Sequence, residues 1–194
     1  MSLFVALWPP PEVVDELAEA ARRARPSATG LRWTRPEEWH LTLAFLGGVP
    51  EDRLPELISA LGRALGGSPA PDLAAHLWGT FPGRAQRASV LWCGVTGEGL
   101  HELAGAVRDA ARGAGVPVES RPFVPHITLA RARPPQDLTE ALRALGPVGA
   151  ACWRAERVHL VESRPGRQDR YRTARTWGLP WGSESQRAPE RGTS

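Results

Sequence analysis

The stretch Trp39-His-Leu-Thr-Leu-Ala-Phe-Leu46 is the segment from which the rest of the chain can be interpreted. Its alternation of polar and apolar residues predicts a β-strand, because successive side chains of a strand point to opposite faces of the sheet. One predicted face carries His40, Thr42 and Ala44. The opposite face, which we expect to be apolar, carries Leu41, Leu43 and Phe45. A histidine and a threonine therefore leave the same side of the strand.

A second segment repeats this pattern later in the chain. In Val124-Pro-His-Ile-Thr-Leu-Ala130, His126 and Thr128 share one face, and Ile127 and Leu129 occupy the other. One His-x-Thr unit carries little information, but two in matching apolar surroundings indicate an internal duplication. We therefore expect the duplication to bring two imidazoles to one cleft.

Around both units, segments with strand patterns alternate with segments with helix patterns. The order strand, helix, strand, helix, strand occurs twice, with extra strands. The strands are expected near residues 3–8, 31–33, 39–46, 73–78, 89–95, 124–130, 153–161 and 171–177, and the helices near 11–24, 51–65, 99–112 and 136–145. This order predicts an α+β fold with two pseudo-symmetric lobes. Each lobe would be an antiparallel sheet with helices on its outer face, and the active-site groove would lie between the lobes.

A single domain accounts for nearly the whole chain. We expect residues 1–182 to form one bilobal domain, with repeats at about 1–82 and 88–180, and residues 183–194 to form a disordered tail because they are polar and lack periodicity. The N-terminal apolar run is too short for a signal peptide, and no segment approaches the length of a membrane span. We therefore expect a cytoplasmic protein with no membrane partner. We expect a monomer, because no helix shows an obvious apolar surface.

The composition favours a phosphate ligand but not a metal. All 24 basic residues are arginine, and the formal net charge is +3. A genome rich in G and C would produce this bias, yet guanidinium groups also match phosphate oxygens better than ammonium groups do. Cys93 and Cys152 lack metal-ligand spacing, so we expect both to be small core residues. His76, His101 and His159 belong to no zinc motif, so no metal or cofactor is expected.

The two His-x-Thr units suit in-line displacement at phosphorus. A neutral imidazole accepts a proton and an imidazolium donates one, both near neutral pH. One histidine could take a proton from the attacking oxygen while the other gives one to the leaving oxygen. Thr42 and Thr128, on the same faces as the histidines, could donate hydrogen bonds to the non-bridging oxygens. The sequence itself does not distinguish the acid from the base.

The flanking residues extend the pattern into a family resemblance. Segments 38–47 and 121–131 resemble the two motifs of the LigT-type RNA 2′,3′-cyclic phosphodiesterases, within the two-histidine phosphoesterase superfamily. The same family is matched by the opening residues 3–7, by Arg32-Trp33, by Leu91-Trp92, and by Glu162-Ser163 followed by Tyr171. The resemblance covers about residues 3–180.

The resemblance implies a reaction and a role for each residue. Such enzymes open an RNA 2′,3′-cyclic phosphate to a 2′-phosphomonoester without a metal or nucleotide cofactor. By position, His126 would be the proton acceptor, His40 the proton donor, and Thr42 and Thr128 the residues that hold the phosphate. Arg131 matches a family arginine that would contact the phosphate, although strict alternation places it on the face opposite His126.

Several alternatives stay open on the sequence alone. The same site could join tRNA fragments by reversible, ATP-independent 2′-5′ ligation. It could also act on a small nucleotide cyclic phosphate or on a 2′-5′ oligonucleotide. In a different class, the histidines would only grip phosphate in a non-catalytic RNA-binding module. Trp33 or Trp39 could stack a base, whereas Phe45 is expected in the core.

Overall fold

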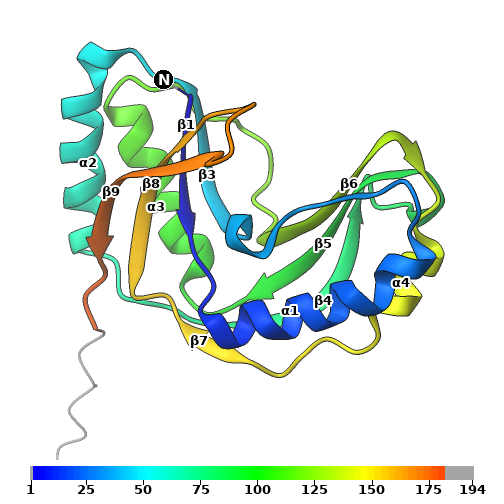
Figure 1. The fold of residues 1–194 in the computed structure, drawn as a ribbon. Coiled ribbons are helices and arrows are strands. Elements are labelled where there is room, and N and C mark those ends of the chain that lie inside the picture. Colours follow the sequence, from blue (N-terminus) through cyan, green and yellow to red (C-terminus); the bar gives the residue numbers. More distant parts are fainter. Residues whose placement is uncertain (1, 182–194) are drawn as a thin grey trace, which may run out of the picture.

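The computed structural model describes residues 2–181 and contains strands and helices in the expected alternation (Figure 1). The first half of the chain contains β1 (Ser2–Leu7), α1 (Pro11–Ala24), β2 (Arg32–Trp33), β3 (Leu41–Gly48), α2 (Leu54–Gly66) and β4 (Asp72–Phe81). The second half contains β5 (Ala88–Thr96), α3 (Leu100–Gly113), β6 (His126–Gln136), α4 (Thr139–Leu145), β7 (Cys152–Arg154), β8 (Arg157–Ser163) and β9 (Tyr171–Gly178). The α+β class is confirmed. The tail expected at residues 183–194 lies outside the described residues.

The strands form one antiparallel sheet that bends into two lobes (Figure 1). Its order is β7-β4-β5-β6-β3-β1-β8-β9, and β2 pairs with β6 beside this path. β3 and β6 join the lobes through a single register pair, Leu41 with Ile127. Both of these side chains are buried. Because neighbouring residues of a strand point to opposite faces, both His-x-Thr units leave the other face of the sheet at this junction.

Each lobe is built from both halves of the sequence. One lobe contains β1, β3, β8 and β9, covered by α2 and α3, and the other contains β2 and β4 to β7, covered by α1 and α4 (Figure 1). Thus α1, β2 and β4 cross into the second lobe, while α3, β8 and β9 cross into the first. The repeats expected at about 1–82 and 88–180 are therefore not the lobes themselves.

Two expectations about the chain after α4 are wrong. The single strand expected near residues 153–161 is two strands, because β7 pairs with β4 in one lobe and β8 pairs with β1 in the other. Cys93 is buried as expected, but Cys152 is exposed. β7 lies at the edge of the sheet, where Trp153 turns inward and Cys152 turns outward.

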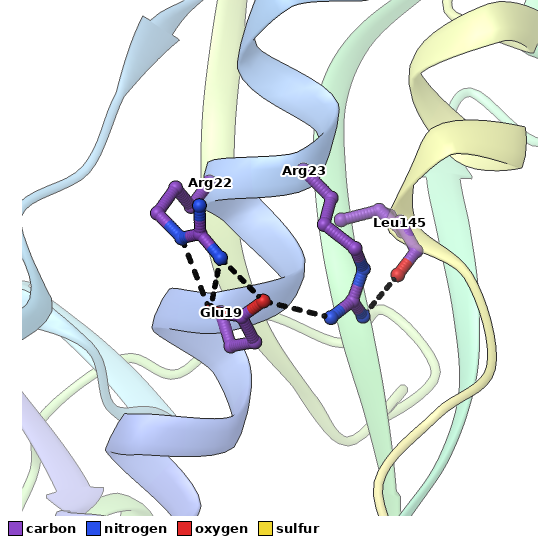
Figure 2. Close-up of polar contacts among 4 residues, drawn as sticks. All are labelled: Glu19, Arg22, Arg23 and Leu145. Carbon is purple, nitrogen blue, oxygen red and sulfur yellow. Dashed lines mark hydrogen bonds and ion pairs between the residues drawn. The ribbon is translucent and has the colours of Figure 1, made fainter.

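The helices bury their apolar faces against the sheet and leave polar contacts at their ends. Leu57, Leu61 and Leu65, one helical turn apart, are fully buried on α2. Between α1 and α4, Arg23 Nη2 donates a 2.7 Å hydrogen bond to the carbonyl of Leu145, and Glu19 also contacts Arg23 (Figure 2). This bond satisfies a carbonyl at the end of α4 that the helix cannot satisfy itself. Among residues 2–181, no helix combines the length and apolar character needed to cross a membrane.

Candidate active site

A cavity of about 810 Å³ lies where the two lobes meet. His40 and Thr42 line it from β3 and the residue before it, and His126 and Thr128 line it from β6. The four residues that the paired motifs single out are thus brought together in one cavity. The rest of the lining comes mainly from β1, from β2 and the turn that follows it, and from the loop between β8 and β9.

A β-bulge in each central strand changes which residues face this cavity. In β3, Thr42 pairs with Ala6 and Ala44 with Val5, so Leu43 is skipped. In β6, Thr128 pairs with Trp92 and Ala130 with Leu91, so Leu129 is skipped. An extra residue in one strand reverses the inward and outward alternation beyond it. The two bulges occupy the same position in both units, three residues after the histidine.

The bulges overturn three expectations drawn from strict alternation. Ala44 was expected beside His40, but it is buried in the core. Phe45 was expected in the core, but it is 56% exposed and lines the cavity. Arg131 was expected on the face opposite His126, but it lines the same cavity. Phe45 and Arg131 each follow their histidine by five residues, so the two lobes offer an aromatic ring and a guanidinium group at equivalent places.

Each histidine ring is oriented by a carbonyl two residues upstream. His40 Nδ1 lies 2.6 Å from the carbonyl oxygen of Glu38, and His126 Nδ1 lies 2.7 Å from that of Val124. A carbonyl oxygen only accepts hydrogen bonds, so Nδ1 must carry the proton in both rings. Nε2 is therefore the nitrogen left to exchange a proton with a ligand.

Aromatic side chains surround both imidazoles. The His40 ring centroid lies 4.9 Å from that of Phe4, 5.0 Å from Tyr171 and 5.4 Å from Trp8. The His126 ring lies 4.9 Å from Phe81 and 5.8 Å from Trp92. These rings exclude water from one side of each histidine and restrict its movement.

This burial lowers the pKa of both histidines. The pKa of His40 is lowered to about 4, mainly by desolvation and to a smaller extent by the charges of His126, Arg131 and Arg170. Desolvation also lowers the pKa of His126, with a contribution from Arg131. Both rings are therefore neutral at pH 7. An anion that enters between the arginines would raise both pKa values, because a negative charge favours the imidazolium form.

The cavity is strongly cationic. The arginines that line it are Arg32, Arg35, Arg131, Arg167 and Arg170. Among the described residues of the lining, Glu38 is the only carboxylate, and it is paired with Arg35 at 2.9 Å. Within residues 2–181, neither the Thr42 nor the Thr128 hydroxyl has a hydrogen-bond partner, so both are free to meet a ligand. This combination suits a phosphate group.

The structure also locates the other residues considered from the sequence. Trp33 lines the cavity, but Trp39 is buried in the core, which excludes Trp39 as a surface for a base. His76, His101 and His159 do not line the cavity. In the described part of the chain, no three His, Cys, Asp or Glu side chains gather as metal ligands would.

Sequence reasoning assigned no role to most of the cationic and aromatic lining. Arg35, Arg167 and Arg170 gave no signal, because arginine is frequent throughout this chain, and Arg32 entered only as part of the family resemblance. Phe4 lies on β1, which pairs with both β3 and β8, and Tyr171 lies on β9, which pairs with β8. Only the folded sheet therefore brings both rings to His40. The signal for Tyr171 was its place after Glu162-Ser163 in the family resemblance, which gave it no role.

Comparisons with known proteins agree with this geometry. A model of the LigT like phosphoesterase family matches residues 7–92 and 95–169. An RNA 2′,3′-cyclic phosphodiesterase of Geobacillus stearothermophilus is 31% identical over 181 residues, which are 91% of this chain and 56% of that protein. One from Thermus thermophilus is 38% identical over 146 residues, or 70% of each chain. The chain thus spans little more than half of the first relative's length.

Solved structures show the same fold. TT0787 of Thermus thermophilus aligns with a TM-score of 0.77 at 28% identity, over 92% of this chain and 98% of that one. LigT of Escherichia coli, complexed with 3′-AMP, aligns with a TM-score of 0.76 at 28% identity, over 92% of this chain and 97% of that one. The two-lobe arrangement expected from the sequence is confirmed by these matches.

Proposed function

The chain belongs to the LigT like phosphoesterase family, and from this premise we propose that it opens 2′,3′-cyclic phosphates at RNA ends to 2′-phosphomonoesters. The observation that carries the proposal is the pair of imidazoles in one arginine-lined cavity. Each has its Nδ1 hydrogen-bonded to a carbonyl and its Nε2 free to exchange protons. The relatives named as RNA 2′,3′-cyclic phosphodiesterases support the same substrate class.

The proposed reaction uses each imidazole once. His126 Nε2 accepts a proton from water as the water oxygen attacks phosphorus. The bond between phosphorus and the ribose 3′-oxygen breaks, and His40 Nε2 donates a proton to that oxygen. The 2′-oxygen keeps the phosphate. Each proton transfer typically contributes about 10²–10⁴-fold to the rate. The direction, with His40 as donor, comes from the family resemblance, because the two rings are held alike.

The threonines and Arg131 would stabilise the charge that develops on the phosphorane. The Thr42 and Thr128 hydroxyls can donate to the non-bridging oxygens from the same face as the histidines. Arg131, beside His126, can donate through two N–H groups, a geometry that matches paired phosphate oxygens. Fixed donors of this kind usually supply the largest part of phosphoryl-transfer catalysis.

Substrate binding would prepare the acid. His40, with a pKa of about 4, is neutral at pH 7 before substrate binds and cannot yet donate from Nε2. The cyclic phosphate brings one negative charge close to Arg131 and Arg170, whose positive charges lower the pKa of His40. Their neutralisation raises that pKa, so His40 acquires its proton together with the substrate.

Phe45 is suited to hold the base of the terminal nucleotide. Its ring is 56% exposed, lines the cavity and lies 6.2 Å from the ring of Phe4. An exposed aromatic ring at the position where the other lobe has Arg131 offers a stacking surface next to the phosphate. Base stacking of this kind tolerates any base, which fits a substrate defined by its end rather than by its sequence.

A short RNA that ends in a 2′,3′-cyclic phosphate tests the proposal. We expect the wild-type protein to produce only the terminal 2′-phosphate, also in excess EDTA, and His40→Ala and His126→Ala to abolish turnover while retaining the wild-type circular dichroism spectrum. Undiminished turnover in both variants would contradict the proposal. RNA binding without any turnover by the wild type would instead favour a non-catalytic RNA-binding module.

A further inference from the structure

The cavity carries more positive charge than a cyclic phosphate can balance. Arg35 is paired with Glu38, but the guanidinium groups of the other four arginines of the lining form no ion pair or hydrogen bond within residues 2–181. These are Arg32, Arg131, Arg167 and Arg170. A cyclic phosphate carries a single negative charge. The cavity is therefore matched to a ligand with further negative charges next to the reacting phosphate.

Arg167 belongs to the loop between β8 and β9 and not to the central strands that carry the histidines. The charges of Arg131 and Arg170 lower the pKa of His40, and the charge of Arg32 lowers the pKa of Arg131. The charge of Arg167 instead lowers the pKa of Asp169 in its own loop. Its exposed side chain still lines the same cavity. An arginine carried by this loop is placed to meet a different anion from the reacting phosphate.

The loop that carries Arg167 is held in place by other arginines. Arg35 Nη2 donates a 2.8 Å hydrogen bond to the carbonyl of Gln168, which ties the loop to the turn before β3. Arg164 forms an ion pair with Asp169 inside the loop, and its backbone N–H donates to the carbonyl of Arg170 at 2.7 Å. Arg35 and Arg164 are thus used to hold the loop. Arg167 and Arg170 line the cavity, and neither forms an ion pair or a side-chain hydrogen bond within residues 2–181.

Arg170 connects the two regions of charge. Its guanidinium lies 5.2 Å from the ring of Tyr171, which in turn contacts His40. Its Nε is buried without a hydrogen-bond partner among the described residues. The loop also lines the cavity with Pro165, Gly166 and Gln168. At Gly166, with φ +83°, an added Cβ would meet nothing within 4 Å, so the backbone there is open to a ligand.

We propose that the β8–β9 loop forms a second phosphate subsite, centred on Arg167 and bordered by Arg170, for the phosphodiester one nucleotide upstream of the cyclic phosphate. The inference rests on the proposed function and deepens it. The subsite makes the enzyme favour a polynucleotide end over a mononucleoside cyclic phosphate. Because Arg167 binds a part of the substrate that does not react, it contributes equally to the ground state and the transition state and acts on KM rather than on kcat.

The test compares three substrates: adenosine 2′,3′-cyclic phosphate, the dinucleotide with the same end, and that dinucleotide with an uncharged methylphosphonate linkage. We expect the wild type to prefer the charged dinucleotide over the uncharged one by about 1.5- to 5-fold in KM, the range for an exposed ion pair. Arg167→Gln should remove this preference and leave kcat unchanged. With longer RNA, the slope of log KM against log salt should fall by about 0.7, the loss of one phosphate contact on a single strand.

Arg175→Gln is the matched control, because Arg175 is an exposed arginine of the same hairpin that does not line the cavity. It should keep the wild-type preference, and thermal melting should show that both variants fold. If Arg167→Gln keeps the preference for the charged linkage, the subsite is refuted while the proposed function stands. If the wild type hydrolyses none of the three substrates, the proposed function is refuted, and the subsite falls with it.

Discussion

A methyl group at Gly79 should disable the site without touching the cavity. Gly79 lies on β4 opposite Trp92 of β5, and a Cβ there would stand 2.2 Å from Cζ2 and 2.3 Å from Cη2 of the indole. Trp92 and its neighbour Phe81 both pack against the ring of His126. Glycine at position 79 therefore provides the space in which the Trp92 ring lies beneath the histidine.

The size of the effect follows from that distance. Carbon atoms in contact lie about 3.5 Å apart, so Gly79→Ala requires the indole to move by roughly 1 Å or more. Overpacking of this kind costs about 1–3 kcal/mol, which lowers the Tm of a domain of this size by about 2–12 °C. A displacement of about 1 Å at a catalytic group can cost about 100-fold in rate. We expect kcat on a cyclic phosphate substrate to fall by that order while KM, set by the arginines and Phe45, changes little.

Two further variants separate this explanation from general damage. Gly178→Ala on β9 is the control, because an added Cβ there meets nothing within 4 Å, and it should keep the wild-type kcat and Tm. Trp92→Leu removes the ring with which the new methyl group collides, so Gly79→Ala should add little to it in a double-mutant cycle. Wild-type kcat in Gly79→Ala, or an equally large loss from Gly79→Ala in the Trp92→Leu background, would refute the reasoning.

Three other predictions follow from burial and charge. Because phosphate binding raises the pKa of His40 from about 4, the decrease of kcat at high pH should occur at a higher pH than the decrease of kcat/KM. Arg170→Gln removes a charge that lowers this pKa, so it should move the decrease of kcat/KM to higher pH. If kcat and kcat/KM of the wild type decrease at the same pH, the argument is contradicted. The pKa of His40 is 6.5 in the unfolded chain and about 4 in the folded protein, so the unfolded state binds more protons between these two pH values. The free energy of unfolding should therefore fall by at most about 3 kcal/mol from pH 7 to pH 4, as measured by urea titration. The fall should be smaller in His40→Gln. Phe45→Ala should raise KM for nucleotide substrates by about 5- to 100-fold, but not for ribose 2′,3′-cyclic phosphate, which has no base to stack; equal effects on both would exclude stacking.

The chemistry of the site could be predicted from local sequence. His40 with Thr42, and His126 with Thr128, stand two residues apart in apolar strands, and that spacing alone places each pair on one face. The helices could also be predicted from local sequence, since Leu57, Leu61 and Leu65 recur at helical spacing and are buried as that spacing requires. These features depend on residues close to one another in the chain, so the linear pattern contains them.

Everything that depends on a neighbouring strand was decided by the tertiary structure. The bulges at Leu43 and Leu129 arise from pairing with β1 and β5, and a single strand's pattern cannot reveal them. For that reason Phe45 and Arg131 were assigned to the wrong faces. The exchange of α1, β4, α3, β8 and β9 between lobes, and the arrival of Arg167 and Arg170 at the cavity, likewise depend on contacts between distant segments. The sequence determined which groups could perform acid–base chemistry. Strand pairing decided which aromatic and cationic side chains surround those groups, because register is a property of two strands and not of one.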